Sequence, residues 1–128
     1  MDVVPGVSLS VNEIGNWIVR YRGSVLSLAD ADEMFRLWAL LEQSPGEVIH
    51  EIDRMAIVLG AHSGFPFRKL VDSALRSRSS RQVDVAIKWL PYLSKSDVAL
   101  LPLEGIVRSK WASQHARHVA RKYLNQRH

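Results

Sequence analysis

Apolar stripes at helical spacing alternate with short breaks of serine, proline or glycine along most of the chain. The clearest stripe consists of Val48, Ile49, Ile52, Met55, Ala56 and Leu59. Ser44 can cap this stripe, Pro45 suits the first helical position, and Glu47 stands where it completes a capping box. Gly60 follows as the expected left-handed terminator. These signals predict a helix from Pro45 to the residue before Gly60.

Three further stripes predict helices in the same way. One runs from Met34 to Leu41 and follows the acidic segment 30–33, where carboxylates stabilise the positive end of a helix. A second runs from Phe67 to Leu75 and carries its charged residues on the opposite face. A third runs from Val83 to Leu90, after a serine-rich break, and is stopped by Pro91.

The last third of the chain predicts two more helices. Ser94 begins a unit that continues through Val98 to Val107, and Pro102 is expected to kink it or to confine regular helix to one side. Apolar residues and one histidine then recur every four positions, which predicts a single amphipathic helix ending near Leu124. The members of this stripe are Val107, Trp111, His115, Val119 and Tyr123.

The first 28 residues fit two structures. Residues 7–11 alternate as a strand does, and residues 17–22 and 25–28 on either side of Gly23-Ser24 can form a hairpin. Against this, residues 10–13 match a capping box, and apolar residues follow at helical spacing up to Tyr21. We favour a helix here, and the small β-hairpin stays the alternative.

One segment resembles a known repeat family. Residues 98–108, followed by Ala112, Ala116 and Ala120, resemble the paired helices of HEAT-like repeats, which stack antiparallel helices with small residues on the inner face. Residues 81–93 are similar in texture, so the resemblance covers about half of the chain. It implies a short curved stack that binds a partner. In size and helical architecture the chain is also similar to small bacterial immunity proteins, which inhibit a cognate toxin domain.

The predicted fold is therefore all-α, with six to seven short antiparallel helices in a bundle or a short HEAT-like stack. We expect a single helical domain over residues 1–128. The composition, 47% hydrophobic and 23% charged, is that of an ordinary globular domain, and zero cysteine excludes disulfides and thiol chemistry. No apolar run approaches the roughly 20 residues of a membrane span, and the first residues lack a signal-peptide pattern. We therefore expect a cytoplasmic protein that does not bind membranes.

The net charge of +4 conceals an asymmetry along the chain. Residues 1–64 contain four basic and nine acidic residues, a net charge of −5, whereas residues 65–128 contain thirteen and four, a net charge of +9. If the halves lie apart, each presents a field that steers partners of the opposite sign. If they fold onto each other, the charges partly neutralise. The sequence leaves both arrangements open.

The sequence offers little catalytic chemistry. It has no phosphate-binding glycine loop and no nucleophile elbow, so we expect no cofactor and no enzyme. We expect His115 to be partly buried on the apolar stripe and His118 to be solvated, without a metal site. Carboxylates in the first turns of helices are favourable without any catalysis. A metal-independent nuclease using His115, Arg117, His118 and Tyr123 is the least favoured hypothesis.

Charged clusters are the candidate partner-binding surfaces. On a continuous helix, Lys110, Arg117 and Arg121 fall within about 40° of one another and form a basic ridge. A second basic cluster surrounds a loop, and the acidic cluster lies in the first half. The members of these two clusters are Arg76, Arg78 and Arg81, and Asp30, Asp32, Glu33, Glu47 and Glu51. Trp89 and Tyr92 lie on either side of Pro91 in the sequence. They are either interface residues or core residues.

Two functions fit these surfaces. The first is a non-enzymatic protein-binding module, most concretely a cytosolic immunity protein that neutralises a cognate toxin domain. Its acidic region could mimic nucleic acid toward a basic nuclease, or its basic half could meet an acidic partner. The alternative is a nucleic-acid-binding protein that uses the basic C-terminal half.

Overall fold

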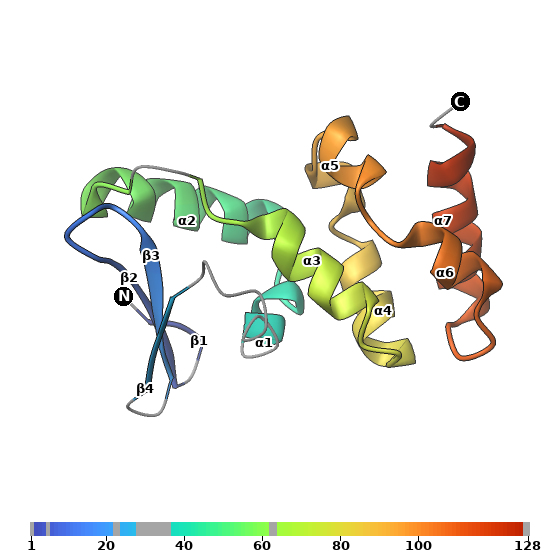
Figure 1. The fold of residues 1–128 in the computed structure, drawn as a ribbon, viewed down its shortest axis with the longest axis horizontal. Coiled ribbons are helices and arrows are strands. Elements are labelled where there is room, and N and C mark those ends of the chain that lie inside the picture. The colour runs from blue at the N-terminus through green and yellow to red at the C-terminus, as the bar shows by residue number, and fades with distance from the viewer. Residues whose placement is uncertain (1, 5, 22–23, 28–36, 62–63, 127–128) are drawn as a thin grey trace. The chain divides into compact units, whose positions relative to one another are not determined.

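The structure is a computed structural model that describes residues 2–4, 6–21, 24–27, 37–61 and 64–126 (Figure 1). It is mainly helical and contains an antiparallel sheet near the N-terminus. The elements group into two units, residues 1–66 and residues 67–128. This division falls two residues after the change of charge, and residues 65 and 66 are uncharged, so the first unit carries −5 and the second +9. The single helical domain stays a prediction.

The first unit opens with a four-stranded antiparallel sheet in which each strand pairs with the next along the chain, in the order β1-β2-β3-β4. Val7, Leu9, Trp17 and Val19 are buried, and Leu9 stands opposite Val19 in the β2–β3 register. The strands are β1 Asp2–Val4, β2 Val7–Val11, β3 Trp17–Tyr21 and β4 Ser24–Ser27. The favoured helix over this region is therefore wrong, the strand alternative is confirmed, and the fold is mainly rather than entirely α-helical.

The physical reason lies in the turn between β2 and β3. Asn12 Oδ1 accepts hydrogen bonds from the backbone amides of Ile14, at 3.1 Å, and of Asn16, at 2.9 Å. Gly15 adopts a φ of 86°, which glycine reaches without steric cost. The residues that matched a capping box thus end one strand and begin a hairpin turn. Ile14, the first member of the apparent helical stripe, is 67% exposed in that turn.

Two helices follow the sheet, α1 Trp38–Leu41 and α2 Pro45–Leu59. Leu40 and Leu41 are buried, while the predicted start of the first helix at 30–36 lies outside the described residues. The predicted bounds of α2 are confirmed: Ser44 is its N-cap, and Gly60 ends it at a φ of 73°. The capping box is not formed, because the Ser44 side chain makes no capping hydrogen bond. The buried side of α2 consists of Val48, Ile52 and Met55.

The described part of the second unit contains six short helical segments. These are α3 Phe67–Leu75, α4 Ser80–Ile87, the 3₁₀ turn η2 Leu90–Tyr92, α5 Lys95–Ala99, α6 Leu103–Arg108 and α7 Gln114–Asn125. The helix α7 packs against α6 and α4, and α3 packs against α4. Trp89 is fully buried and its ring stacks on that of Phe67, with centroids 5.7 Å apart. This pair lies in the core of the unit.

Serine side chains cap three of these helices. The hydroxyl oxygens of Ser79, Ser94 and Ser113 accept hydrogen bonds from the backbone amides of Gln82, Asp97 and Ala116, at 3.3, 3.1 and 3.0 Å. The caps satisfy amides that have no partner within the first turn of a helix. The predicted start at Ser94 is confirmed. Pro102 does interrupt the unit, but regular helix stands on both sides of it rather than on one, since α5 ends at Ala99 and α6 begins at Leu103.

The predicted single helix over residues 107–124 is wrong. The chain leaves helical geometry after Arg108, because the Ser109 hydroxyl donates to the Ile106 carbonyl at 2.8 Å and accepts from the Ala112 amide at 3.3 Å. Serine competes with the helix for backbone groups in this way. A new helix begins only after Ser113. The stripe of five residues therefore belongs to two helices and a connection.

Candidate functional site

The exposed face of α2 joins acidic and apolar side chains in one stripe. Glu47, Glu51, Arg54 and Val58 lie at i, i+4, i+7 and i+11, which places them within about 60° of one another around the helix. All four are exposed. Glu47 lies in the first turn of the helix, where it complements the helix dipole, and Glu51 follows one turn later. The C-terminal end is apolar.

The apolar end of this stripe is unusually open to solvent. Ile57 is 83% exposed and Val58 is 66% exposed, although both are large aliphatic residues. Adjacent exposed aliphatic residues that are bordered by charge are typical of a surface that contacts another protein. We call the set Glu47, Glu51, Arg54, Ile57 and Val58 the α2 face.

An ion pair organises the middle of the α2 face. The Arg54 guanidinium donates hydrogen bonds to the Glu51 carboxylate one turn earlier. This hydrogen bond lowers the pKa of Glu51 below its usual value of 4.5, and the same contact raises the pKa of Arg54. Both groups are exposed, so the pair orders the surface more than it stabilises the fold.

Of the predicted acidic cluster, two members are on the α2 face. Glu47 and Glu51 are exposed there, as expected for a contact surface. Asp30, Asp32 and Glu33 lie outside the described residues.

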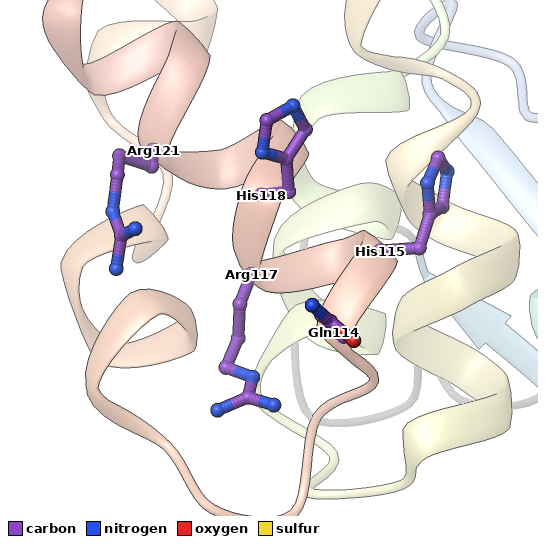
Figure 2. Close-up of a pocket in the computed structure, with 5 residues that line it drawn as sticks. All are labelled: Gln114, His115, Arg117, His118 and Arg121. Carbon is purple, nitrogen blue, oxygen red and sulfur yellow. The ribbon is translucent and has the colours of Figure 1, made fainter.

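A second candidate site is an open surface hollow of about 590 Å³ along one side of α7. Its lining contains two arginines, two histidines and an amide, and no carboxylate among the described residues: Gln114, His115, Arg117, His118 and Arg121 (Figure 2). Figure 2 shows the guanidinium groups of Arg117 and Arg121 extending in one direction from the helix and the rings of His115 and His118 in another. We call this the α7 cavity.

The buried side of α7 fixes the position of the helix that lines the α7 cavity. Ala116 and Ala120 are fully buried, which lets α7 approach its neighbours closely. At the start of the helix, the Ser113 hydroxyl donates to Asp84 Oδ1 on α4 at 2.5 Å and also caps α7. The direction of the helix is thereby fixed at one end by a cap and along one side by small residues.

Arg117 differs from the other residues of the α7 cavity. Its side chain is half-buried, and its Nε atom is shielded from solvent without a hydrogen-bond partner. Burying a charged donor without an acceptor costs free energy, so such groups in proteins normally have a partner. Because the Nε atom is shielded, a ligand in the cavity would meet the rest of the half-buried guanidinium rather than Nε itself.

The structure corrects one expectation about the basic ridge and one about His115. Arg117 and Arg121 line one cavity, but Lys110 lies in the connection between α6 and α7 and does not share their helix. His115 is exposed rather than partly buried, because α7 begins at Gln114 and turns its alanines inward. His118 is exposed, as expected.

The three arginines around the loop form a weaker candidate binding surface than the sequence suggests. Arg76 is exposed but its Nε donates to Asp72 Oδ2 at 3.0 Å, which partly neutralises it. Arg78 is exposed and adopts a positive φ of 59°, in the turn between α3 and α4. Arg81 is exposed on α4. None of the three is among the residues that line the α7 cavity.

A third feature is a mostly apolar groove of about 870 Å³ in the second unit, which the sequence did not indicate. It is lined by Leu90, Pro91, Leu93, Lys95, Ser96, Val98, Ala99, Tyr123 and Gln126. Tyr123 therefore lies at this groove, whereas the histidines and Arg117 that were grouped with it line the α7 cavity. Trp89 belongs to the core, and Tyr92 is 54% exposed.

Sequence reasoning missed the α7 cavity because it treated α7 as the end of a longer helix. The available signal was the pair Ser109 and Ser113, each followed three residues later by an alanine whose amide it caps. A helix that begins after Ser113 and buries Ala116 and Ala120 leaves both histidines exposed.

Within the described residues, no three histidine, cysteine or carboxylate side chains gather closely enough to hold a metal ion, and no helix is long and apolar enough to cross a membrane. Comparison with protein families, with curated proteins and with solved structures finds no match for this chain.

Proposed function

We propose that the chain is a non-enzymatic protein-binding module whose α2 face binds a basic protein partner. The observation that carries the proposal is the exposure of Ile57 and Val58 at the C-terminal end of a helix face whose N-terminal end carries Glu47 and Glu51. Burial of apolar side chains contributes favourable binding free energy at protein interfaces, while complementary charge raises the rate of encounter. The net charge of −5 on the first unit supports a partner of opposite sign.

The most concrete form of this proposal is an immunity protein that neutralises a cognate toxin domain in the bacterial cytoplasm. A basic nuclease domain is the kind of toxin that an acidic face fits, because its substrate-binding surface is positive in order to hold nucleic acid. The proposed mechanism is occlusion of that surface and requires no catalytic group on this chain.

The test compares two double variants as baits in capture from host cells. The variant I57S/V58S removes the apolar end of the α2 face, and I14S/V25S removes two exposed aliphatic residues of the first unit outside α2. We expect the wild type and I14S/V25S to recover the same basic protein in equimolar amount. We expect I57S/V58S to bind it at least tenfold more weakly by calorimetry. Equal loss in both variants, or recovery of nucleic acid alone, contradicts the proposal.

A second candidate function, nucleic-acid binding by the second unit, is favoured by a different observation. That unit carries +9, and its α7 cavity contains cations without a neutralising carboxylate among the described lining residues. Binding of this kind weakens steeply with salt, because each contacted phosphate releases counterions. Titration of labelled single-stranded and duplex oligonucleotides at several salt concentrations tests it, and no binding at low salt would contradict it.

A further inference from the structure

We infer that the α7 cavity is a binding site for a nucleoside phosphate, with Arg117 and Arg121 holding the phosphate group. The inference sharpens the second candidate function, since it assigns the ligand chemistry to one site. It does not depend on the α2 face or on the protein partner proposed above.

The first argument is the unmet hydrogen-bonding capacity of Arg117. Its Nε atom is shielded from water and has no acceptor, and its guanidinium makes no ion pair with the described residues. Arginine presents several donors in a planar fork that matches phosphate oxygens, so a phosphate satisfies this group better than a single carbonyl does. An anion with several oxygens in the cavity would contact the guanidinium through its other nitrogens, because the Nε atom itself is shielded from solvent.

The second argument is the placement of the neighbouring arginine. Arg121 lies one helical turn after Arg117, and both guanidinium groups extend in the same direction from α7 (Figure 2). Two arginines at i and i+4 project from the same side of a helix, so they can hold one phosphate between them. No carboxylate among the described lining residues competes for either group.

The third argument concerns the remainder of the ligand. A volume of about 590 Å³ exceeds what one phosphate group fills and falls within the roughly 300–1,000 Å³ that is usual for small-ligand sites. His115 and His118 offer flat rings on which a base can stack, and the Gln114 amide offers both a donor and an acceptor. Stacking and an amide contact are the means by which proteins hold single-stranded bases. The lining thus fits a nucleoside attached to the phosphate.

The ligand can come from two sources with this shared chemistry, a free nucleotide or the phosphate of a nucleic-acid strand. Three probes distinguish them: inorganic phosphate, adenosine monophosphate and a fluorescent 12-residue single-stranded oligonucleotide. Nitrogen-15 NMR of the full chain follows the Arg117 Nε–H signal directly during each titration. We expect this signal to shift with at least one of the two nucleoside phosphates, and the tighter of these identifies the source. Absence of a shift with every probe overturns the inference.

Matched variants test the two arginines. R117Q/R121Q removes two positive charges from the α7 cavity, and R108Q/K122Q removes two from exposed positions of α6 and α7 outside it. We expect about 100-fold weaker binding in R117Q/R121Q, about tenfold in R121Q alone, and no more than about threefold in R108Q/K122Q. For the strand, the salt dependence of R117Q/R121Q should lose about 0.7 in slope, since the two arginines hold one phosphate and each neutralised phosphate contributes about 0.7.

Several outcomes overturn the inference. Equal loss in R117Q/R121Q and R108Q/K122Q would mean that diffuse charge holds the ligand. If R117Q/R121Q bound the strand as tightly as the wild type, the protein would still be a nucleic-acid-binding protein, but the strand would bind outside this cavity. Equal competition by polyglutamate would mean that the arginines accept any carboxylate. Because Arg117 is half-buried, circular dichroism checks folding of its variant, and R121Q together with the wild-type NMR titration gives an answer even if that variant unfolds.

Discussion

The two units differ in charge, in secondary structure and in what their exposed faces offer to a partner. The first unit is acidic, begins with a sheet, and exposes carboxylates at one end of the α2 face and apolar side chains at the other. The second unit is basic, entirely helical in its described elements, and gathers arginines and histidines around one cavity. The change of charge coincides with the boundary between the units. The acidic surface therefore lies on the first unit and the basic surface on the second.

Because of this difference, the two units are suited to two different kinds of ligand. An apolar patch with a charged border suits a folded protein surface, because burial of aliphatic groups supplies the free energy. A cavity of cations and flat rings suits a small anion or a nucleic-acid strand. A single net charge of +4 would have suggested only mild basicity for the whole chain.

The largest expected effect comes from breaking the core of one unit. Trp89→Ala removes a fully buried ring that stacks on Phe67 and should destabilise the second unit by about 3–5 kcal/mol. Leu9→Ala is the matched change in the first unit, with an expected cost of about 2–5 kcal/mol. Hydrogen exchange followed by mass spectrometry should show faster exchange mainly in the unit that carries the change. An equal rise in both units for either variant would show that the comparison does not hold.

A smaller loss is expected from the cap that holds α7. Ser113→Ala removes the cap and leaves Asp84 without its hydroxyl donor, which should cost about 1–2 kcal/mol. Ser94→Ala removes a cap alone and should cost about 1 kcal/mol. Urea unfolding curves compare the two variants. If Ser94→Ala proves the more destabilising, the hydrogen bond to Asp84 does not contribute as argued.

A gain of stability is expected at the turn between α3 and α4. Arg78 adopts a left-handed backbone conformation at a φ of 59°, which costs a side-chain-bearing residue about 1–2 kcal/mol. Arg78→Gly relieves this strain and loses part of the gain to unfolded-state entropy, so a net gain of about 0.5–1 kcal/mol is expected. Arg78→Ala removes the same charge and keeps the strain. Equal urea midpoints for the two variants would assign any effect to charge rather than to backbone.

The smallest effect concerns the ion pair on the α2 face. The hydrogen bond from Arg54 lowers the pKa of Glu51, so its small contribution to stability is present at neutral pH and is lost as the pH falls through that lowered pKa, below 4.5. NMR titration of the Glu51 carboxyl should show the low midpoint, and Arg54→Gln should return it toward 4.5. Because both groups are exposed, urea midpoints at pH 7 should not change measurably. An unchanged titration midpoint in Arg54→Gln would be inconsistent with the pair.

The sequence predicted the helices where local signals agree and failed where two signals compete. Ser94, Pro102 and Gly60 mark real boundaries because each acts on its own backbone: a cap, a missing donor and a positive φ. At the N-terminus, the same residues fit both the spacing of a helix and the alternation of a strand. The turn formed by Asn12 and Gly15 and the pairing of β2 with β3 decided between them, and propensity and spacing alone do not weigh such pairing.

The candidate sites divide in the same way. The exposure of Glu47 and Glu51 followed from the phase of α2, whose bounds the sequence indicates. The phase of α7 did not follow, because Ser109 and Ser113 interrupt a stripe that looked continuous through Trp111 and His115. The unpartnered Arg117 Nε could not be predicted at all, since it depends on how the helices of the second unit pack.

The central claim is that the α2 face and the α7 cavity bind different partners. Quantitative capture from host cells with three baits tests it: wild type, I57S/V58S and R117Q/R121Q. We expect a basic protein to be lost only with I57S/V58S, and nucleotide or nucleic acid to be lost only with R117Q/R121Q. Loss of both kinds of partner with either single bait would contradict the claim.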